Sequence, residues 1–247
     1  MSVKFIAITQ RLVENSSYYE VREALSLEWG AFFKANLNGF LPLPLSYEIP
    51  FIKYVESLGD SLCGVILSGG NDLGCFSDSG ISKMRDSYEK GVIEACVKFR
   101  IPLLGICRGA QMIAWYFGSS LKKCSGHVGE HLVEFCESFR AVGAESCEVE
   151  SCGIISNKSG IAKSGIANWQ QGQNEQKEYL VNSYHNFGIF TLGKDLEAVA
   201  YASDGSVEAF KHSSKNIFGI MWHIERIGCE AGLEIINFKE CLCKKGR

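Results

Sequence analysis

The chain has 247 residues, a formal net charge of −3 and 46% hydrophobic residues. These values are typical of a globular protein and argue against a collagen-like, coiled-coil or disordered chain. The basic residues form no tract, so we expect no nucleic-acid partner. No segment approaches the roughly 18 consecutive apolar residues of a membrane helix, so we expect no membrane contact. Residues 1–10 lack the basic start and long apolar core of a signal peptide.

The cysteine content indicates the compartment. Eleven cysteines are scattered along the chain, and an odd, scattered set is unlike a disulfide framework. A reducing environment fits better, so we expect a cytoplasmic protein. The length favours one α/β domain over residues 1–247 rather than two small ones. Whether the protein forms a homo-oligomer is left open.

The first half of the chain alternates predicted strands and helices. Strands are predicted at residues 3–9, 64–67 and 102–106, and helices at 19–37, 82–99 and 108–117. Alternating elements with almost continuously apolar strands predict a doubly wound, mostly parallel sheet flanked by helices on both faces. Such sheets bind ligands at the carboxyl ends of their strands.

The second half is dominated by shorter predicted strands, which form a small antiparallel excursion from the sheet. They lie at residues 132–135, 147–150, 178–184, 197–202, 207–211 and 216–222, and an amphipathic helix is predicted at 229–244. Residues 151–176 are rich in small and polar side chains and contain the pentapeptide KSGIA twice. This composition predicts an exposed loop, either a flap bordering the active site or a passive connection.

Cys107 is the candidate nucleophile. It lies between Gly105 and Gly109 where a predicted strand passes into a predicted helix, which is the pattern of a nucleophile elbow. Small residues are needed beside such a sharp, strained turn. The start of the helix favours the thiolate over the thiol. The alternative is an ordinary buried cysteine, as we interpret the other ten.

A candidate base follows the last predicted strand. His223 would emerge at the same sheet edge as Cys107, and Glu225 could accept a hydrogen bond from the imidazole and fix its tautomer. Taken alone, the pair would be interpreted as a surface histidine beside a solvated glutamate.

Acyl chemistry also requires donors for an oxyanion. Gly69 and Gly70 follow a strand and let the backbone approach a ligand, while the Arg108 amide lies beside the sulfur at the helix start. We predict the Gly70 and Arg108 N–H groups as the oxyanion donors. A plain glycine turn is the alternative.

Four segments together resemble the class I glutamine amidotransferase family, and within it the free-standing γ-glutamyl hydrolases typified by γ-glutamyl-γ-aminobutyrate hydrolases. They are LSGGNDL at 67–73, PLLGICRGAQ at 102–111, VNSYHN at 181–186 and GIMWHIE at 219–225. The resemblance spans most of the chain. It implies a flavodoxin-like fold and a cysteine hydrolase that releases glutamate from a small-molecule γ-glutamyl amide, with no metal and no organic cofactor.

The same resemblance implies roles for individual residues. Cys107, His223 and Glu225 would form the catalytic triad, with Gly70 and Arg108 as oxyanion donors. The positions that would contact the glutamyl group are Gly69, Gln111, Ser183, Tyr184 and His185. His185 could instead be a structural histidine.

This chain departs from the family pattern at Ile224, where relatives usually have proline. The turn between the base, His223, and the carboxylate that orients it, Glu225, is therefore less constrained.

The N-terminal stretch at 8–29 resembles a narrower group encoded among genes for nucleotide-activated surface sugars. That resemblance implies that Arg11 and Arg22 contact the phosphates of the substrate. Otherwise they are surface charges. The competing functions are a glutaminase subunit supplying ammonia to a synthetase, and a ligand sensor using Cys107 as a redox switch.

Overall fold

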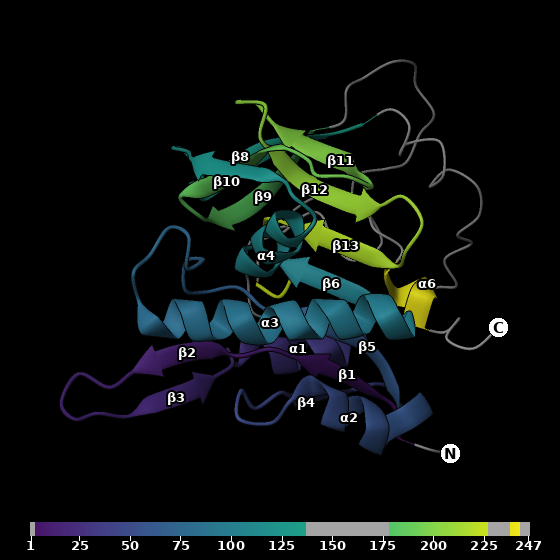
Figure 1. The fold of residues 1–247 in the computed structure, drawn as a ribbon. Coiled ribbons are helices and arrows are strands. Elements are labelled where there is room, and N and C mark those ends of the chain that lie inside the picture. The colour runs from purple at the N-terminus through teal and green to yellow at the C-terminus, as the bar shows by residue number, and fades with distance from the viewer. Residues whose placement is uncertain (1–2, 137–177, 227–237, 243–247) are drawn as a thin grey trace, which may run out of the picture.

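One half of the central sheet is parallel. The computed structural model describes residues 3–136, 178–226 and 238–242. Within them, five neighbouring strands of an 11-stranded sheet pair in parallel (Figure 1). Their order is β4 (Leu41–Pro44), β1 (Phe5–Ile8), β5 (Leu62–Leu67), β6 (Leu103–Ile106) and β13 (Ile217–Ile220). The predicted α/β class is confirmed.

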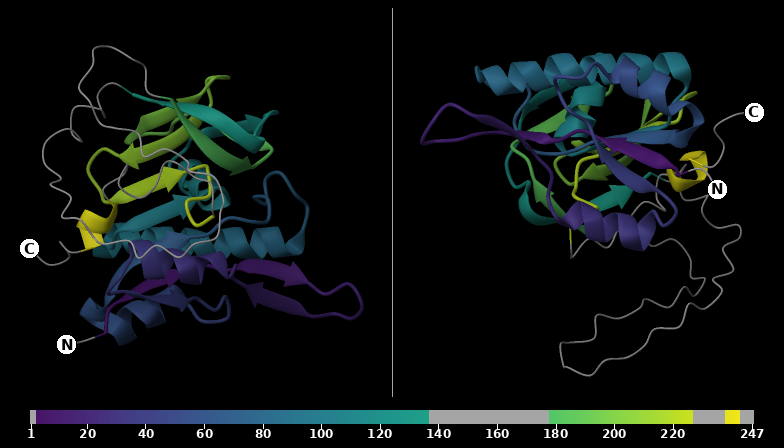
Figure 2. Two further views of the ribbon diagram at one scale, coloured as in Figure 1. Left: turned by 180° about the vertical axis from the view of Figure 1, so that it is seen from behind. Right: turned by 90° about the horizontal axis from the view of Figure 1, so that it is seen from below.

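Helices cover both faces of this parallel half, as Figure 2 shows for α1 and α3. The helices are α1 (Glu28–Asn36), α2 (Phe51–Leu58), α3 (Gly80–Phe99), α4 (Arg108–Tyr116) and α6 (Phe238–Leu242), with a 3₁₀ turn, η1, at Gly59–Ser61. Successive strand residues face opposite layers. Ile6 and Ile8 pack in one core with Trp29 of α1, whereas Ala7 packs in the other with Phe51 of α2.

The other half of the sheet is antiparallel and more extensive than the small excursion predicted. Beyond β13 the order continues with β12 (Val207–His212), β11 (Leu196–Ala202), β8 (Val128–Phe135) and β9 (Glu178–Tyr184). Two further strands, β10 (Phe187–Thr191) and β7 (Ser120–Lys123), pair with each other, and β10 also pairs with β12. In this half, β12 pairs with β13, and Asn182 of β9 reaches the segment that follows β13.

The helix predicted at residues 19–37 is wrong over its first turns. Val21–Ala24 forms strand β3, which pairs antiparallel with β2 (Arg11–Glu14) in a hairpin that projects from the body of the protein (Figures 1 and 2). The helical spacing of the apolar residues favoured a helix here. Pairing with β2 favours a strand instead, because it satisfies backbone groups that a single turn of helix at this place would leave to water. Only α1 is helical here.

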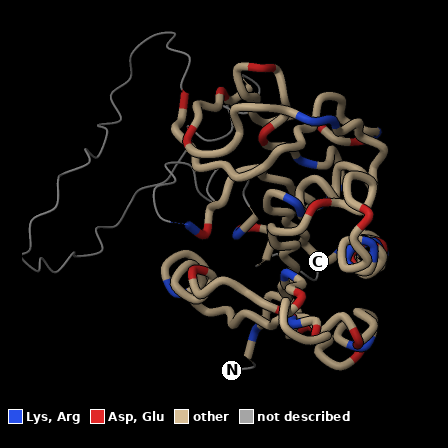
Figure 3. The backbone as a smooth tube through the Cα atoms, turned by 90° about the vertical axis from the view of Figure 1, so that its left-hand side faces the viewer, with Lys and Arg blue, Asp and Glu red and all other residues tan. Residues whose placement is uncertain are grey.

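Several predictions concern residues outside the described part of the chain. The strand at 147–150, the loop at 151–176 and the first turns of the final helix belong to this group. In α6, Phe238 and Leu242 are buried, which fits an amphipathic helix. None of the described helices is long and apolar enough to cross a membrane. Acidic and basic positions are intermixed along the chain (Figure 3).

Candidate active site

Cys107 occupies a strained turn between β6 and α4. Its backbone has φ 50° and ψ −108°, a conformation that L-residues rarely adopt. The Cys107 N–H donates to the Ile220 carbonyl at 2.7 Å, so this residue is tied to the end of the neighbouring strand β13. The residue is 5% exposed. The predicted nucleophile elbow is therefore present, and it places the sulfur at the carboxyl edge of the sheet.

The two flanking glycines allow three backbone segments to approach one another. A Cβ at Gly105 would come within 2.5 Å of the Gly109 backbone, so the strand and the helix start are in direct contact. A Cβ at Gly109 would collide with the carbonyl of Leu67 at the end of β5. The glycine spacing thus reflects close packing of β5, β6 and α4 as well as the sharpness of the turn.

His223 lies beside Cys107 and is held from two sides. Its Nδ1 is 2.7 Å from Glu225 Oε1, with Ile224 between them in place of proline. Asn182 of β9 accepts from the His223 N–H at 2.9 Å and donates to the His223 carbonyl at 3.1 Å. Burial lowers the pKa of His223, but hydrogen bonds with Cys107 and Glu225 outweigh it and raise that pKa to about 9. The imidazole is therefore protonated at neutral pH.

The glycine loop after β5 lies against both of these residues. A Cβ at Gly69 would be 2.8 Å from His223 Cε1 and 3.5 Å from Cys107 Cβ. Gly70 has φ 87°, in the left-handed region that glycine tolerates. The Arg108 amide is the first of α4, and such an amide has no acceptor within its own helix. These positions suit the predicted oxyanion donors.

Arg85 of α3 supports the glycine loop from below. This fully buried side chain donates to the carbonyls of Ser68, Gly69 and Gly70, at 2.8 to 3.1 Å. It also donates to Asn71 Oδ1 at 3.1 Å. Because the guanidinium has five fixed donors, one side chain can determine the path of the whole loop.

Two acidic groups of α3 balance the buried arginines. Glu89 pairs with Arg85 at 3.1 Å and also with the side chain of Arg108, which in turn pairs with Asp86. The side chains of Arg85, Glu89 and Arg108 are at most 2% exposed. The side chain of Arg108 is thus part of this buried network, and only its amide is the predicted oxyanion donor. Burial lowers the pKa of Arg108, and the negative charge of Glu89 partly opposes this effect.

The residues predicted to contact the glutamyl group have different surroundings. Gln111 is buried and donates to the Phe187 carbonyl at 2.8 Å, which ties α4 to β10. Tyr184 is 50% exposed, with its ring edge against His223 at 5.6 Å between centroids. Ser183 is buried, and its Oγ has no hydrogen-bond partner. His185 lies in a separate buried cluster of histidines around Glu208.

Sequence reasoning missed two contributors to this site. Asn182 stands in the VNSYHN segment, and its position two residues before Tyr184 on one strand would have placed both on the same face. Arg85 had no such pattern, because a charged residue in an amphipathic helix ordinarily faces solvent.

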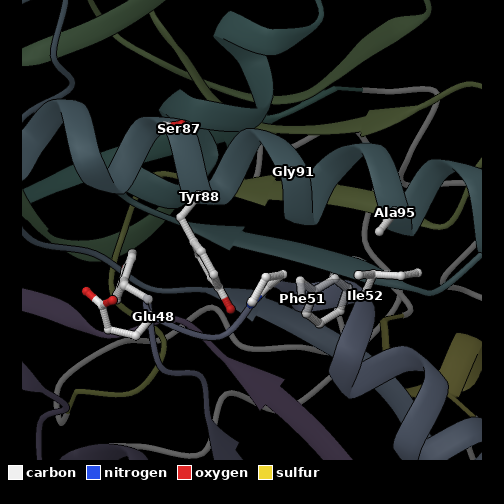
Figure 4. A pocket seen from close by; sticks show the side chains of 9 residues that line it. Glu48, Phe51, Ile52, Ser87, Tyr88, Gly91 and Ala95 are labelled. Carbon is white, nitrogen blue, oxygen red and sulfur yellow. The ribbon is translucent and has the colours of Figure 1, made fainter.

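A groove between α2 and α3 is lined by none of the candidate catalytic residues. Phe51 and Ile52 of α2 face Tyr88 and Ala95 of α3 across it (Figure 4). Tyr88, which lines this groove, donates to the Ile49 carbonyl at 3.2 Å. Among the described residues, no cysteine or histidine lines this groove, so it lacks the chemistry that Cys107 and His223 provide.

Comparisons with known proteins agree with this geometry. The family model described as Peptidase C26 matches residues 6–225. The chain is 46% identical over 234 residues to the gamma-glutamyl-CDP-amidate hydrolase of Campylobacter jejuni, covering 94% of each protein. Among solved structures, it resembles one from Thermoplasma acidophilum, provisionally described as a GMP synthase subunit, with a TM-score of 0.64 at 19% identity over 98% of this chain and 96% of that one.

A second solved structure has a similar fold. A glutamine amidotransferase from Thermotoga maritima gives a TM-score of 0.56 at 18% identity, covering 91% of this chain and 77% of that one. At these identities the two structures establish the fold alone.

Proposed function

Because the chain belongs to the Peptidase C26 family, we propose that it is a cysteine hydrolase that cleaves a γ-glutamyl amide bond and releases glutamate. The observation that carries this proposal is the assembly of Cys107, His223 and Glu225 from two neighbouring strand ends. A nucleophile, a base and a group that orients the base are the minimum for covalent acyl transfer.

The reaction proceeds in two halves. The Cys107 thiolate attacks the γ-carbonyl carbon, and the Gly70 and Arg108 amides bind the oxyanion that forms. The C–N bond breaks as the protonated His223 gives its proton to the leaving nitrogen, which leaves a γ-glutamyl thioester. His223, now neutral, takes a proton from water; the hydroxide attacks the thioester, and glutamate and the thiolate are released.

The substrate we propose is γ-glutamyl-CDP-amidate, cleaved to glutamate and cytidine diphosphoramidate for capsular phosphoramidate synthesis. The extent and identity of the match to the relative that bears this substrate in its name support the choice. So does Arg11, whose side-chain stem lies over Gly70, within 2.7 Å of where a Cβ there would stand. A cation at this rim suits a diphosphate attached to the leaving nitrogen.

A glutamate-release assay tests the proposal. We expect turnover of γ-glutamyl-CDP-amidate to exceed that of free glutamine and of simple γ-glutamyl amines, and Cys107→Ala to abolish it while the protein stays folded. Full activity of Cys107→Ala would refute the mechanism. Faster hydrolysis of free glutamine, further stimulated by a synthetase, would favour the ammonia-supplying glutaminase instead.

The cytoplasm is the compartment we propose for this reaction. The nucleophile must remain reduced to act, and a reducing compartment keeps such a thiol reduced.

A further inference from the structure

Four side chains that the proposed mechanism does not use converge at one point in the antiparallel half of the sheet. His127 immediately precedes β8, His131 is in β8, His185 immediately follows β9, and Glu208 is in β12. The facing nitrogen and oxygen atoms of these four residues all lie within 4.8 Å of one another. We infer that this histidine cluster is a binding site for a divalent transition-metal ion, with zinc the ion expected.

The inner atoms of the cluster lack hydrogen-bond partners. His127 Nδ1 is 3.2 Å from the Glu208 carboxylate, and Nε2 of His131 and of His185 are each 3.6 Å from it. None of these three nitrogens makes a well-aligned hydrogen bond within the described residues, and neither does Glu208 Oε2. Their attraction to the Glu208 carboxylate is nevertheless felt, because it is the main cause that raises the pKa of His127 to about 8. Leaving buried polar atoms unpaired costs roughly 1–3 kcal/mol each, so four at one point require an explanation.

The outer nitrogen of each imidazole does have a partner. His127 Nε2 is 3.1 Å from Asp204 Oδ2, His131 Nδ1 is 3.3 Å from the Leu132 carbonyl, and His185 Nδ1 is 3.9 Å from Cys124 Sγ. If each ring carries its proton on the outer nitrogen alone, three lone pairs face Glu208. Metal-binding histidines have this arrangement, in which an outer acceptor orients the ring and sets the tautomer.

Burial strengthens the case for a cation at this point. Glu208 is completely buried, and His127 and His185 are each 4% exposed. A buried carboxylate needs a compensating charge. Without an ion, His127 supplies it, since hydrogen bonds with Glu208 and Asp204 raise its pKa to about 8; a divalent ion bound among the inner atoms would take the place of that proton. The ion would also turn each unpaired inner atom into a ligand.

The donor set selects the ion. Imidazole nitrogens suit zinc and its neighbours, whereas Mg²⁺ and Ca²⁺ prefer oxygen ligands. On a tetrahedral zinc with bonds of about 2.0–2.1 Å, the ligand atoms would be about 3.3 Å apart. The cluster therefore has to contract slightly, by adjustments of the side chains. Four protein ligands leave no open position, which is typical of a structural site.

A structural ion here would stabilise the surroundings of the catalytic histidine. His185 is three residues after Asn182, which holds the backbone of His223. The Glu208 carbonyl accepts from the Met221 N–H at 2.8 Å, two residues before His223. The ion would thus fasten two of the segments that support His223. The family resemblance led us to expect no metal. The four candidate ligands come from separate segments of the chain, so no local spacing marked them in the sequence.

Metal binding to the full-length protein tests this inference. The protein is stripped with a chelator under reducing conditions, then titrated with Co²⁺ as a spectroscopic probe and with Zn²⁺. We expect one Co²⁺ bound by nitrogen and oxygen, without a thiolate-to-cobalt charge-transfer band. Loss of an outer partner typically weakens metal binding roughly 10–100-fold, and we expect Asp204→Asn to fall within that range. We expect His131→Ala, which removes a proposed ligand at a half-buried position, to weaken metal binding by more than this.

Matched controls separate this site from the thiols. His212→Ala removes the other histidine outside the triad and should bind as the wild type does, as should Cys107→Ala. Wild-type protein should also unfold at a higher temperature with zinc than with chelator, since binding to the folded state stabilises it. That measurement requires no variant to fold.

Three results would overturn the inference. One is the failure of stripped wild-type protein to bind either ion or to gain stability from zinc. The second is equal affinity in His131→Ala and wild type, and the third is a thiolate band that accounts for all the bound Co²⁺. In each case the cluster would be a metal-free network of histidines sharing protons with Glu208.

Discussion

The side-chain amide of Asn182 binds both backbone polar groups of His223, accepting from its N–H at 2.9 Å and donating to its carbonyl at 3.1 Å. This pairing joins β9, in the antiparallel half of the sheet, to the segment that follows β13 in the parallel half. The position of the proposed catalytic base, His223, therefore depends on a residue 41 positions away in sequence.

Replacing Asn182 by alanine should consequently impair catalysis and stability together. The variant leaves two buried backbone groups unpaired, which we expect to cost about 1–3 kcal/mol in the free energy of unfolding. A displaced base should lower kcat on the order of 100-fold. Urea unfolding and glutamate release measure the two effects. Asn38→Ala, at an exposed position, is the control, and wild-type kcat in Asn182→Ala would contradict the assignment.

The acid–base properties of His223 predict an alkaline limit to activity. With its pKa at about 9, the imidazolium that protonates the leaving nitrogen is lost as the pH rises through that value. We expect kcat/KM to fall on the alkaline side with an apparent pKa near 9. In Cys107→Ala one of the hydrogen bonds that raise this pKa is gone, so an NMR titration should find it lower. An unchanged titration would mean that the sulfur and the imidazole do not interact.

The same group links stability to pH. Its pKa is raised from an ordinary value of 6.5, so the folded state binds this proton more tightly than the unfolded state does. The resulting stabilisation is fully present below about pH 6.5 and is lost as the pH rises through about 9. Unfolding of wild type and His223→Gln, compared across this range, should show a difference that shrinks with rising pH. A difference that grows would reverse the sign assigned here.

Gly69 should tolerate no side chain. An alanine Cβ there would be 2.8 Å from His223 Cε1, so the imidazole would have to move. We expect kcat to fall on the order of 100-fold in Gly69→Ala. Gly91→Ala on α3 is the matched control, because its Cβ would meet nothing within 4 Å and should leave activity unchanged. Comparable activity of the two variants would show that the loop does not constrain the base.

The buried ion network should be sensitive to loss of one charge. Glu89→Gln leaves Arg85 and Arg108 buried with one carboxylate fewer, and breaking such a network costs roughly 3–5 kcal/mol. Glu94→Gln on the exposed side of the same helix should cost much less. Equilibrium unfolding in urea measures both. Equal stabilities would show that the network contributes nothing.

Arg11 should distinguish phosphate-bearing substrates from others. We expect Arg11→Ala to raise KM for γ-glutamyl-CDP-amidate about 10-fold, as loss of a charge-assisted hydrogen bond of about 1.5 kcal/mol implies. Hydrolysis of a γ-glutamyl amide without phosphates should not change. Arg22→Ala should have a smaller effect, because Arg22 is already paired with Glu20. An equal loss with both kinds of substrate would remove Arg11 from phosphate recognition.

The sequence by itself determined the features that depend on neighbouring residues. The elbow at Cys107 follows from a strand, a helix and two glycines within a few residues, and the pairing of Glu225 with His223 spans two positions. Local geometry of this kind can be predicted from the spacing of residues in the sequence. The alternation of apolar strands with helices likewise predicted the parallel half of the sheet, because burial of both faces requires that composition.

The tertiary structure alone decided which distant residues support that chemistry. Val21–Ala24 became a strand because β2 was available as a partner, which helical spacing could not reveal. Arg85 faces inward because the carbonyls of the glycine loop and the carboxylate of Glu89 lie within hydrogen-bond distance of its guanidinium. Asn182 reaches His223 through the meeting of the two sheet halves. Hydrogen bonds and charge pairs act over a few ångströms of space. The number of residues between two partners in the sequence therefore does not predict whether they will interact.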